Sequence, residues 1–268
     1  MVYGIVQLIN FAHGDIIMVG AYVTYVGLVM AGVPLWAAVL ISILFCGLAG
    51  VLIEKLAYSR LLKMGAPRIS LLITAIGVSI FLQNLSQLLF SSSAKSMPAM
   101  FPNTMLELGT LQISSNTLLN IGTSVVMMIA LQLLVNKTKM GKAMRATSED
   151  AGAAKLMGIN TNSTIAITFG VGSALAAVGA VLYCNTFHQI TPYMGGMLGL
   201  KAFVAAVLGG IGSIPGAMLG GYILGVAESL TTAAGGSQIT DAVVFGILIL
   251  VLLIKPAGLL GKNVREKV

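Results

Sequence analysis

Long apolar runs separated by short polar loops dominate the chain. A helix needs about 20 mostly apolar residues to cross a bilayer. Runs of about that length lie near residues 14–32, 35–54, 69–91, 117–136, 164–184, 197–211, 215–233 and 239–255. This pattern predicts an all-α, polytopic membrane helix bundle of about eight spanning segments. The run 197–211 is short, which leaves open a broken or tilted helix there. Residues 1–12 are apolar but too few to cross, so we expect the end of a span whose beginning is absent.

The basic residues lie in alternate loops and thereby orient the predicted bundle. Loops 54–68 and 137–160 and the C-terminal segment 255–268 hold four, five and four Lys or Arg residues, respectively. Loop 92–116 holds only one, and loop 185–196 holds none. By the positive-inside rule, the three basic segments are cytoplasmic and the C-terminus lies inside.

This orientation constrains the loops and the short spans. Between the basic loop 137–160 and the basic C-terminus, the chain must cross the membrane an even number of times. Segments 197–211 and 215–233 therefore either both cross or together form a re-entrant pair, and we favour two crossings. In the external loop 92–116, the alternating apolar and polar residues 106–113 predict an external turn or a small hairpin.

Composition supports a bilayer environment and excludes other classes of protein. The chain is 57% hydrophobic and 9% charged, whereas soluble domains carry roughly 25% charged residues. A soluble enzyme, a disordered protein and a nucleic-acid binder are therefore excluded, and the net charge of +7 is explained by membrane orientation. Cys46 and Cys184 are far apart and form no CxxC motif, so we expect neither a disulfide framework nor a metal site.

Glycines gather in the C-terminal third of the chain. The pairs Gly216/Gly220 and Gly221/Gly225 have the four-residue spacing typical of close contact between membrane helices. A phosphate-binding loop at residues 209–212 is the alternative interpretation. No lysine follows these glycines, so helix packing is favoured.

Polar residues inside apolar runs are candidates for a substrate pathway or for hydrogen bonds between helices, because polar groups are costly in lipid. Such candidates are Asn10, Ser79, Gln83 and Asn84. Ser79 and Gln83 share one helix face with Ser86 and Gln87, and this face should turn inward. His13 and Asp15 lie two residues apart and face different sides of a helix, which favours structural roles. Lys201 and Glu228 either pair, contact an external partner or extend to the membrane interface.

The basic segment 140–160 predicts a short helix between two spans. Ser148, followed by Glu149 and Asp150, has the residue types that open a helix. Alanines continue the helix, and Gly158 with Asn160 can end it. Small side chains suit an element that docks closely into another protein. A solvated connector without a partner is the alternative interpretation.

This segment resembles the coupling loop of ABC-importer permeases, a relative of their EAA motif. Five further stretches agree with one family in the same order: residues 1–4, 7–15, 75–84, 201–203 and 206–217, together with the closing Glu266-Lys267-Val268. The sequence as a whole resembles branched-chain amino-acid ABC transporter permeases of the LivH type. Members of that family usually carry another hydrophobic helix before the segment matching residues 1–4, so we expect a misassigned start or a shortened chain.

The resemblance implies a single transmembrane permease domain over residues 1–268 with a cytoplasmic coupling loop at 137–162. It further implies an importer of the bacterial inner membrane with a second permease subunit, two ATP-binding subunits and an external substrate-binding protein. Coupling to the ATP-binding subunits is expected at Gly141, Arg145, Glu149, Asp150, Ala151, Ala154 and Gly158. Asn10, Ser79, Gln83 and Asn84 are the expected pathway residues. The implied substrates are leucine, isoleucine, valine or related amino acids, with urea and short amides as alternatives.

The chain has no sequence for ATP hydrolysis of its own. A phosphate loop needs GxxxxGK[ST], but Asn136 stands where the first glycine should be and Ala143 replaces the final hydroxyl residue. We therefore expect no cofactor, no catalytic residue and no metal on this chain, with ATP bound by partner subunits. A stand-alone channel or secondary transporter and a membrane assembly subunit without a pathway are the alternative functions.

Overall fold

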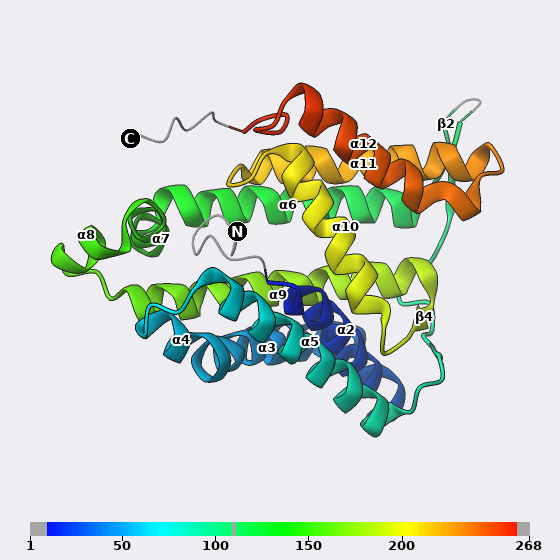
Figure 1. The fold of residues 1–268 in the computed structure, drawn as a ribbon. Coiled ribbons are helices and arrows are strands. Elements are labelled where there is room, and N and C mark those ends of the chain that lie inside the picture. The colour runs from blue at the N-terminus through cyan, green and yellow to red at the C-terminus, as the bar shows by residue number, and fades with distance from the viewer. Residues whose placement is uncertain (1–9, 109–110, 262–268) are drawn as a thin grey trace. The chain divides into compact units, whose positions relative to one another are not determined.

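The computed structural model describes residues 10–108 and 111–261, which divide into two compact units (Figure 1). The first unit comprises residues 10–199 and the second residues 200–261. The expected partial span at residues 1–12 lies largely outside the described residues, as does the closing Glu266-Lys267-Val268. The expectation of one permease domain over the whole chain stays a prediction.

The first unit is a helix bundle with a small β-structure at one end. Its helices are α2 (Ala12–Tyr25), η1 (Val26–Met30), α3 (Leu35–Ile53), η2 (Glu54–Tyr58), α4 (Ser59–Lys63), α5 (Arg68–Phe90), α6 (Ser115–Lys137), α7 (Lys139–Glu149), α8 (Ala151–Leu156), α9 (Thr161–Phe187) and the start of α10 (Met194–Gly209). Its strands are β1 (Lys95–Ser96), β2 (Met105–Leu108), β3 (Leu111–Ser114) and β4 (Gln189–Ile190). The η elements here are π-helical turns continuous with the α-helices before them.

The predicted all-α membrane architecture is confirmed. Among the described residues, six helices are long and apolar enough to cross a membrane. They are Ala12–Met30, Leu35–Lys63, Ile69–Phe90, Ser115–Lys137, Thr161–Phe187 and Ser237–Ile254. The second of these continues well past the predicted boundary at residue 54, because the first helix breakers after it are Gly65, with a φ of +63°, and Pro67. A predicted basic loop is thus largely helical.

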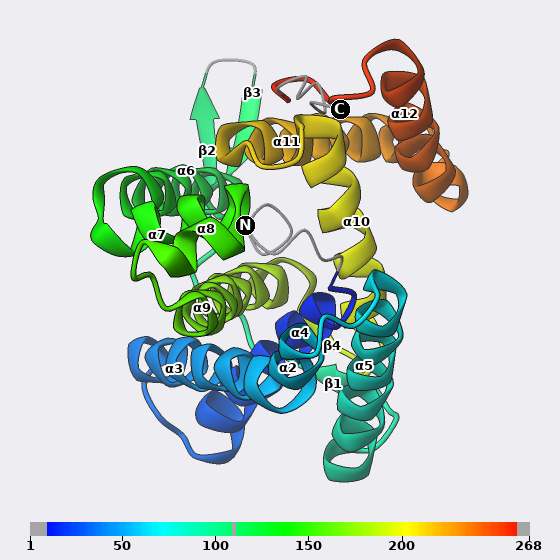
Figure 2. The same ribbon diagram turned by 60° about the vertical axis from the view of Figure 1, so that its left-hand side comes forward.

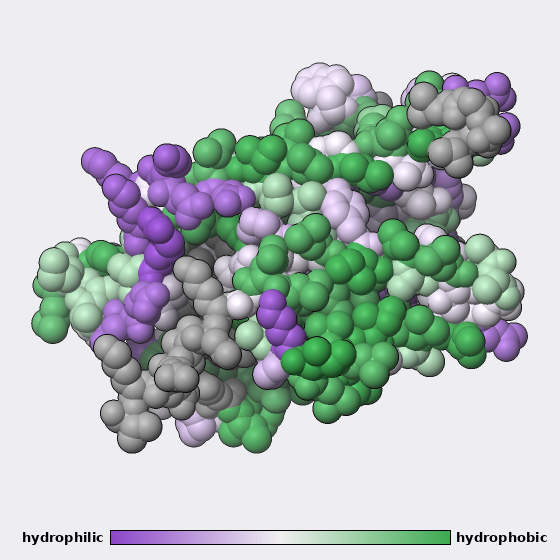
Figure 3. All heavy atoms as spheres, turned by 90° about the horizontal axis from the view of Figure 1, so that it is seen from above, coloured by the Kyte–Doolittle hydropathy of each residue, from purple (hydrophilic) through white to green (hydrophobic). Residues whose placement is uncertain are grey.

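The loops of the first unit lie at two opposite ends, as the charge pattern predicts. β1 pairs antiparallel with β4, which joins loops 92–116 and 185–196 side by side. The predicted hairpin is confirmed, because β2 pairs antiparallel with β3 with Leu106 opposite Ile113. The other end carries α4, α7 and α8 and is called here the basic end (Figure 1). In Figure 3, hydrophilic side chains gather where α7 lies, whereas the spanning helices are mostly apolar.

Small residues let α9 pack closely against α2 and α3 at the centre of the first unit. A Cβ atom at Gly50 would lie 2.8 Å from the Phe169 carbonyl oxygen and against the Ser173 side chain. A Cβ atom at Gly20 would lie 3.1 Å from the Ala177 Cα atom. Close backbone approach of this kind provides van der Waals packing where lipid gives no hydrophobic driving force between helices.

The second unit contains the end of α10, α11 (Ile214–Ala233), the 3₁₀ turn η3 (Ser237–Ile239) and α12 (Thr240–Ile254). Buried Val204, Leu208, Leu224 and Val244 form its core. The chain after α12 folds back on the end of α10, where the Leu259 N–H donates to the Leu208 carbonyl oxygen at 2.8 Å.

Helices α10 and α11 form a pair bent by 117°. Gly210, with a φ of +104°, allows the turn, and a Cβ atom at Gly220 would collide with the Ala205 carbonyl oxygen. Close packing is therefore confirmed for Gly216/Gly220, whereas a Cβ atom at Gly221 or Gly225 would meet nothing within 4 Å among the described residues. A pair bent so sharply is a broken span or a re-entrant loop, so the count of about eight spans is not confirmed.

Lys201 is the cation of an ion triad in the second unit. Its Nζ lies 3.0 Å from a Glu228 carboxylate oxygen and 2.9 Å from one of Asp241. Pairing of Lys201 with Glu228, one of three expected possibilities, is thus observed. Asp241 is an addition that the sequence pattern did not indicate.

Candidate functional site

The end of α6 and the start of α7 form a tight corner at the basic end. Thr138 lies between the helices, and its Oγ1 accepts a hydrogen bond at 3.0 Å from the Gly141 N–H. Gly141 is buried, and a Cβ atom there would collide with the backbone carbonyl groups of Leu134 and Val135. Gly141 therefore fixes the angle at which α7 leaves the span, a positioning role.

Helix α7 lies beside α6 and α8 (Figure 2). It is amphipathic, with one buried and one exposed face. Gly141, Met144 and Thr147 recur at three-residue spacing and are buried. Arg145 and Glu149, two of the expected coupling residues, are exposed. The outer face thus presents charges of both signs beyond the ends of the spans.

The helix predicted to start at Ser148 begins at Asp150 instead. Ser148 lies in the last turn of α7, where its hydroxyl donates to the Arg145 carbonyl oxygen at 2.7 Å. Asp150 is extended, and its Oδ1 accepts hydrogen bonds from the N–H groups of Gly152 and Ala153 at 2.7 and 3.0 Å. A carboxylate is the stronger cap here, because it satisfies two free N–H groups and complements the positive end of the helix.

Two large apolar side chains are exposed at the end of the short helix α8. Leu156 and Met157 are 90% and 82% exposed, and Gly158 follows with a φ of +82° that ends the element. Ala151 is exposed, but Ala154 is 4% exposed and packs against the chain itself. A bulky residue at Ala154 would therefore disturb the seating of α8 and not only a contact with another protein.

Leu156 and Met157 are exposed apolar residues that the sequence analysis did not single out. The sequence does contain a signal for them. They are two consecutive large apolar residues in a segment that is otherwise small and polar. Adjacent large apolar side chains that are both exposed are candidates for a contact surface.

A second group of polar side chains meets inside the first unit. Asp15 on α2 is fully buried and accepts hydrogen bonds from the Ser79 hydroxyl and, at 3.0 Å, from the Gln83 Nε2 of α5. The Gln83 Nε2 also lies 3.3 Å from the Ser79 Oγ. The predicted inward face of α5 is thus observed at Ser79 and Gln83, and its partner is a carboxylate 64 residues away in sequence.

The other two pathway candidates lie apart from this Asp15–Ser79–Gln83 cluster. The Asn10 Oδ1 accepts a hydrogen bond from the buried Tyr58 hydroxyl at 2.9 Å. Asn84 is exposed, and its Nδ2 donates to the Ile80 carbonyl oxygen of its own helix. The four residues therefore do not form one site.

Glycines bring the start of α10 against the Asp15 region. A Cβ atom at Gly195 would lie 2.6 Å from the Asp15 Oδ1, and one at Gly199 would lie 2.9 Å from the Gly14 Cα. This contact encloses the carboxylate between α2, α5 and α10. Among the described residues, no group of three or more His, Cys, Asp or Glu side chains is placed to hold a metal ion.

Apolar spans that enclose a polar cluster define a multi-pass membrane protein. The chain belongs to the family described as branched-chain amino acid transport system / permease component, whose model matches residues 1–253. The chain is therefore a permease component.

Curated relatives cover the whole chain. It is 45% identical over 280 aligned positions to the high-affinity branched-chain amino acid transport system permease protein BraD of Pseudomonas aeruginosa, covering 100% of this chain and 91% of the relative. It is 43% identical over 281 positions to the permease protein LivH of Escherichia coli K12, covering 100% and 90%. A probable LivH of Methanocaldococcus jannaschii is 31% identical over 267 positions, covering 94% and 82%. No solved structure matches the chain significantly.

Proposed function

We propose that this chain is a transmembrane permease subunit of an ABC importer that takes up branched-chain amino acids. The observation that carries the proposal is full-length similarity to permeases named for that transport, in a chain that exposes a docking element beyond its spans. The basic end faces the cytoplasm of a bacterial cell, the membrane is the inner membrane, and the C-terminus is cytoplasmic.

Energy comes from partner chains, because this sequence has no phosphate loop. Two ATP-binding subunits hold ATP, and one of them docks on α7 and α8 of this chain. A second permease subunit completes the pathway, and an external binding protein delivers the substrate. The exposed charges of α7 and the apolar Leu156 and Met157 support this docking, since they combine a polar rim with apolar anchors.

Transport proceeds by alternating access. ATP binding closes the two ATP-binding subunits and moves α7 and α8. Because Gly141 fixes α7 rigidly to α6, this motion is passed to the spans and opens the pathway toward the loaded binding protein. The partner drives this change only if it contacts the two states differently. We expect Ser79 and Gln83 to border the pathway, and their hydrogen bonds to the buried Asp15 support this assignment.

Uptake of labelled leucine in cells that lack and then regain this chain tests the substrate. We expect restored uptake that isoleucine and valine inhibit and that urea and acetamide leave unchanged. Restored uptake of urea or a short amide without leucine uptake would overturn the proposed substrate.

A further inference from the structure

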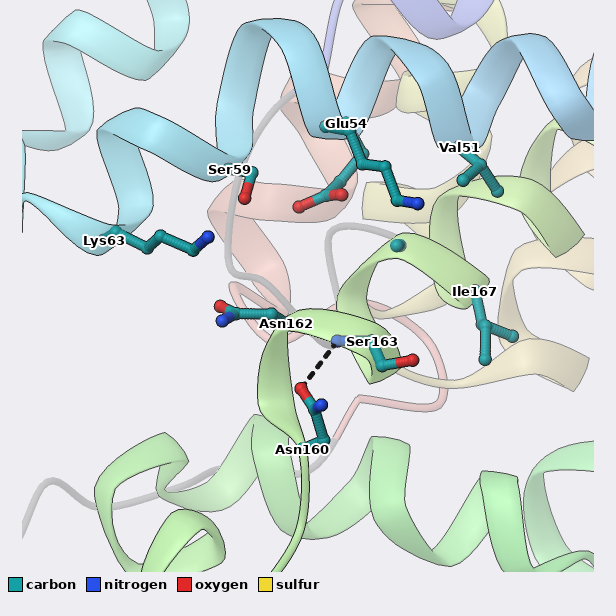
Figure 4. Close-up of a pocket in the computed structure, with 10 residues that line it drawn as sticks. Val51, Glu54, Ser59, Lys63, Asn160, Asn162, Ser163 and Ile167 are labelled. Atoms are coloured by element: carbon teal, nitrogen blue, oxygen red, sulfur yellow. Dashed lines mark hydrogen bonds between the residues drawn. The ribbon is translucent and has the colours of Figure 1, made fainter.

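A pocket lies at the basic end of the first unit, outside both groups of residues described above. Its volume is about 560 Å³, and it lies between the η2–α4 segment and the first turns of α9. In Figure 4, Glu54 and Lys63 extend into the same space from one side, and Asn162 faces it from the other. The pocket therefore presents both signs of charge to one ligand-sized volume.

Glu54 is the buried charged residue among those that line this pocket. It is 2% exposed, and within the described residues its carboxylate makes no direct hydrogen bond and no ion pair within 4.0 Å, although the charges of Lys55 and Lys63 act on it from a greater distance. A buried carboxylate without a partner is costly, and a cation or donor that reaches it removes that cost. An unpaired carboxylate that lines a pocket therefore indicates a ligand with a positively charged or donating group.

Contacts of Tyr58 hold the backbone turn that contains Glu54 in place. Glu54–Tyr58 is a π-helical turn, a feature frequent at functional sites. The Tyr58 hydroxyl donates to the Asn10 Oδ1 at 2.9 Å, and its ring contacts Phe169 with centroids 5.3 Å apart. This anchoring fixes the turn on α9, so that Glu54 is held toward the pocket.

Cationic and donor groups line the rest of the pocket. Lys55 and Lys63 are exposed, and neither forms an ion pair with Glu54. Asn162 lies in the first turn of the 27-residue helix α9, whose N-terminus carries partial positive charge. These groups suit an anionic group on a ligand whose cationic group lies at Glu54.

We propose that this pocket binds a compact zwitterion, a molecule that carries an ammonium group next to an anionic group. A lone cation at Glu54 would be repelled by Lys55 and Lys63, and a lone anion would be repelled by the unpaired Glu54. A zwitterion avoids both repulsions, because its ammonium group lies on Glu54 and its anionic group lies near Lys63 and Asn162. Two sources supply this chemistry at the end of a membrane bundle: a phosphatidylethanolamine headgroup and a free α-amino acid.

Two binding measurements on the purified complex distinguish these sources. Native mass spectrometry measures retention of phosphatidylethanolamine against phosphatidylglycerol, and equilibrium dialysis without the external binding protein measures labelled leucine. We expect Glu54→Gln and Lys63→Met each to weaken the bound zwitterion about tenfold or more, since each loses a charge-assisted contact. Neither readout uses ATP or transport, so the result is independent of the proposed function.

Matched substitutions outside the pocket provide the controls. Glu107→Gln in the β2 strand and Lys95→Met in β1 repeat the same chemical changes at the opposite end and should leave binding unchanged. Lys63 is exposed, so Lys63→Met tests the site even if Glu54→Gln disturbs folding. If lipid retention depends on both Glu54 and Lys63, the site binds the lipid headgroup. If leucine binding depends on both residues, the site binds the amino acid.

Two outcomes would overturn the proposal. One is that neither lipid retention nor leucine binding changes in Glu54→Gln and Lys63→Met. The other is that phosphatidylglycerol binds as well as phosphatidylethanolamine, with dependence on Lys63 alone and no leucine binding, which would define a site for anions only.

Discussion

Removal of the two exposed apolar side chains of α8 should detach the partner subunits without unfolding the chain. The change is Leu156→Ser combined with Met157→Ser. Since both side chains are largely in solvent, their replacement should alter the stability of the isolated chain by about 0.5 kcal/mol or less. Any large effect must therefore come from a surface that covers them in the complex.

The expected loss follows from the apolar area available for burial. Complete burial of a Leu or Met side chain contributes about 1.5–3 kcal/mol, and nearly all of each side chain is exposed here. Part of that gain is offset by ordering of the two side chains. A net loss of about 2–4 kcal/mol follows, which weakens binding of the ATP-binding subunits roughly 30- to 1,000-fold.

Affinity purification of the tagged chain, with quantification of each retained partner, measures this effect, and leucine uptake is read in parallel. Met64→Ser is the matched control, because Met64 is 65% exposed at the same end in the other basic segment. Partner retention and uptake equal to those of the unmodified chain would refute the docking of α8.

Three further substitutions test the packing and polar contacts, each read as the unfolding midpoint in detergent. Asp15→Ala should destabilise the first unit by about 2–4 kcal/mol, because Ser79 and Gln83 lose their acceptor. An unfolding midpoint equal to that of Asp15→Asn would contradict this prediction. Gly50→Ala should destabilise by about 1–3 kcal/mol through overpacking, whereas Gly77→Ala, whose Cβ meets nothing within 4 Å among the described residues, should be neutral or stabilising. Lys201→Met should destabilise the second unit by about 1 kcal/mol, because its partly exposed carboxylate partners lose their shared cation, and Lys201→Arg should retain stability; equal midpoints for both variants would count against the triad.

The membrane architecture could be predicted because the bilayer limits the solutions. Spans of fixed length and uninterrupted hydrogen bonding leave a strong sequence signal, and the charge asymmetry of the loops indicates which loops share an end. The pairing of β1 with β4 and the hairpin of β2 with β3 agree with that assignment. Whether segments 197–211 and 215–233 both cross the membrane could not be predicted in this way, because the turn at Gly210 depends on packing between the two helices.

The details of the site were harder to predict, because they depend on contacts distant in sequence or on competing local signals. Ser148, Glu149 and Asp150 are all acceptable helix starts, and only the structure selects Asp150. Asp15 was taken as structural from its spacing to His13, whereas its contacts come from a different helix. Ala154 has the small side chain of a contact surface, but the fold buries it and exposes Leu156 instead.

The central claim is that partner chains energise this permease. Purification from the native membrane in mild detergent, followed by identification of every co-purifying chain and reconstitution into vesicles, tests it most directly. We expect ATP-binding subunits and a second permease to co-purify, and leucine uptake to require both ATP on the side of the basic end and the external binding protein. Recovery of this chain alone, with leucine transport after reconstitution in the absence of ATP, would contradict the claim and identify a channel or secondary carrier.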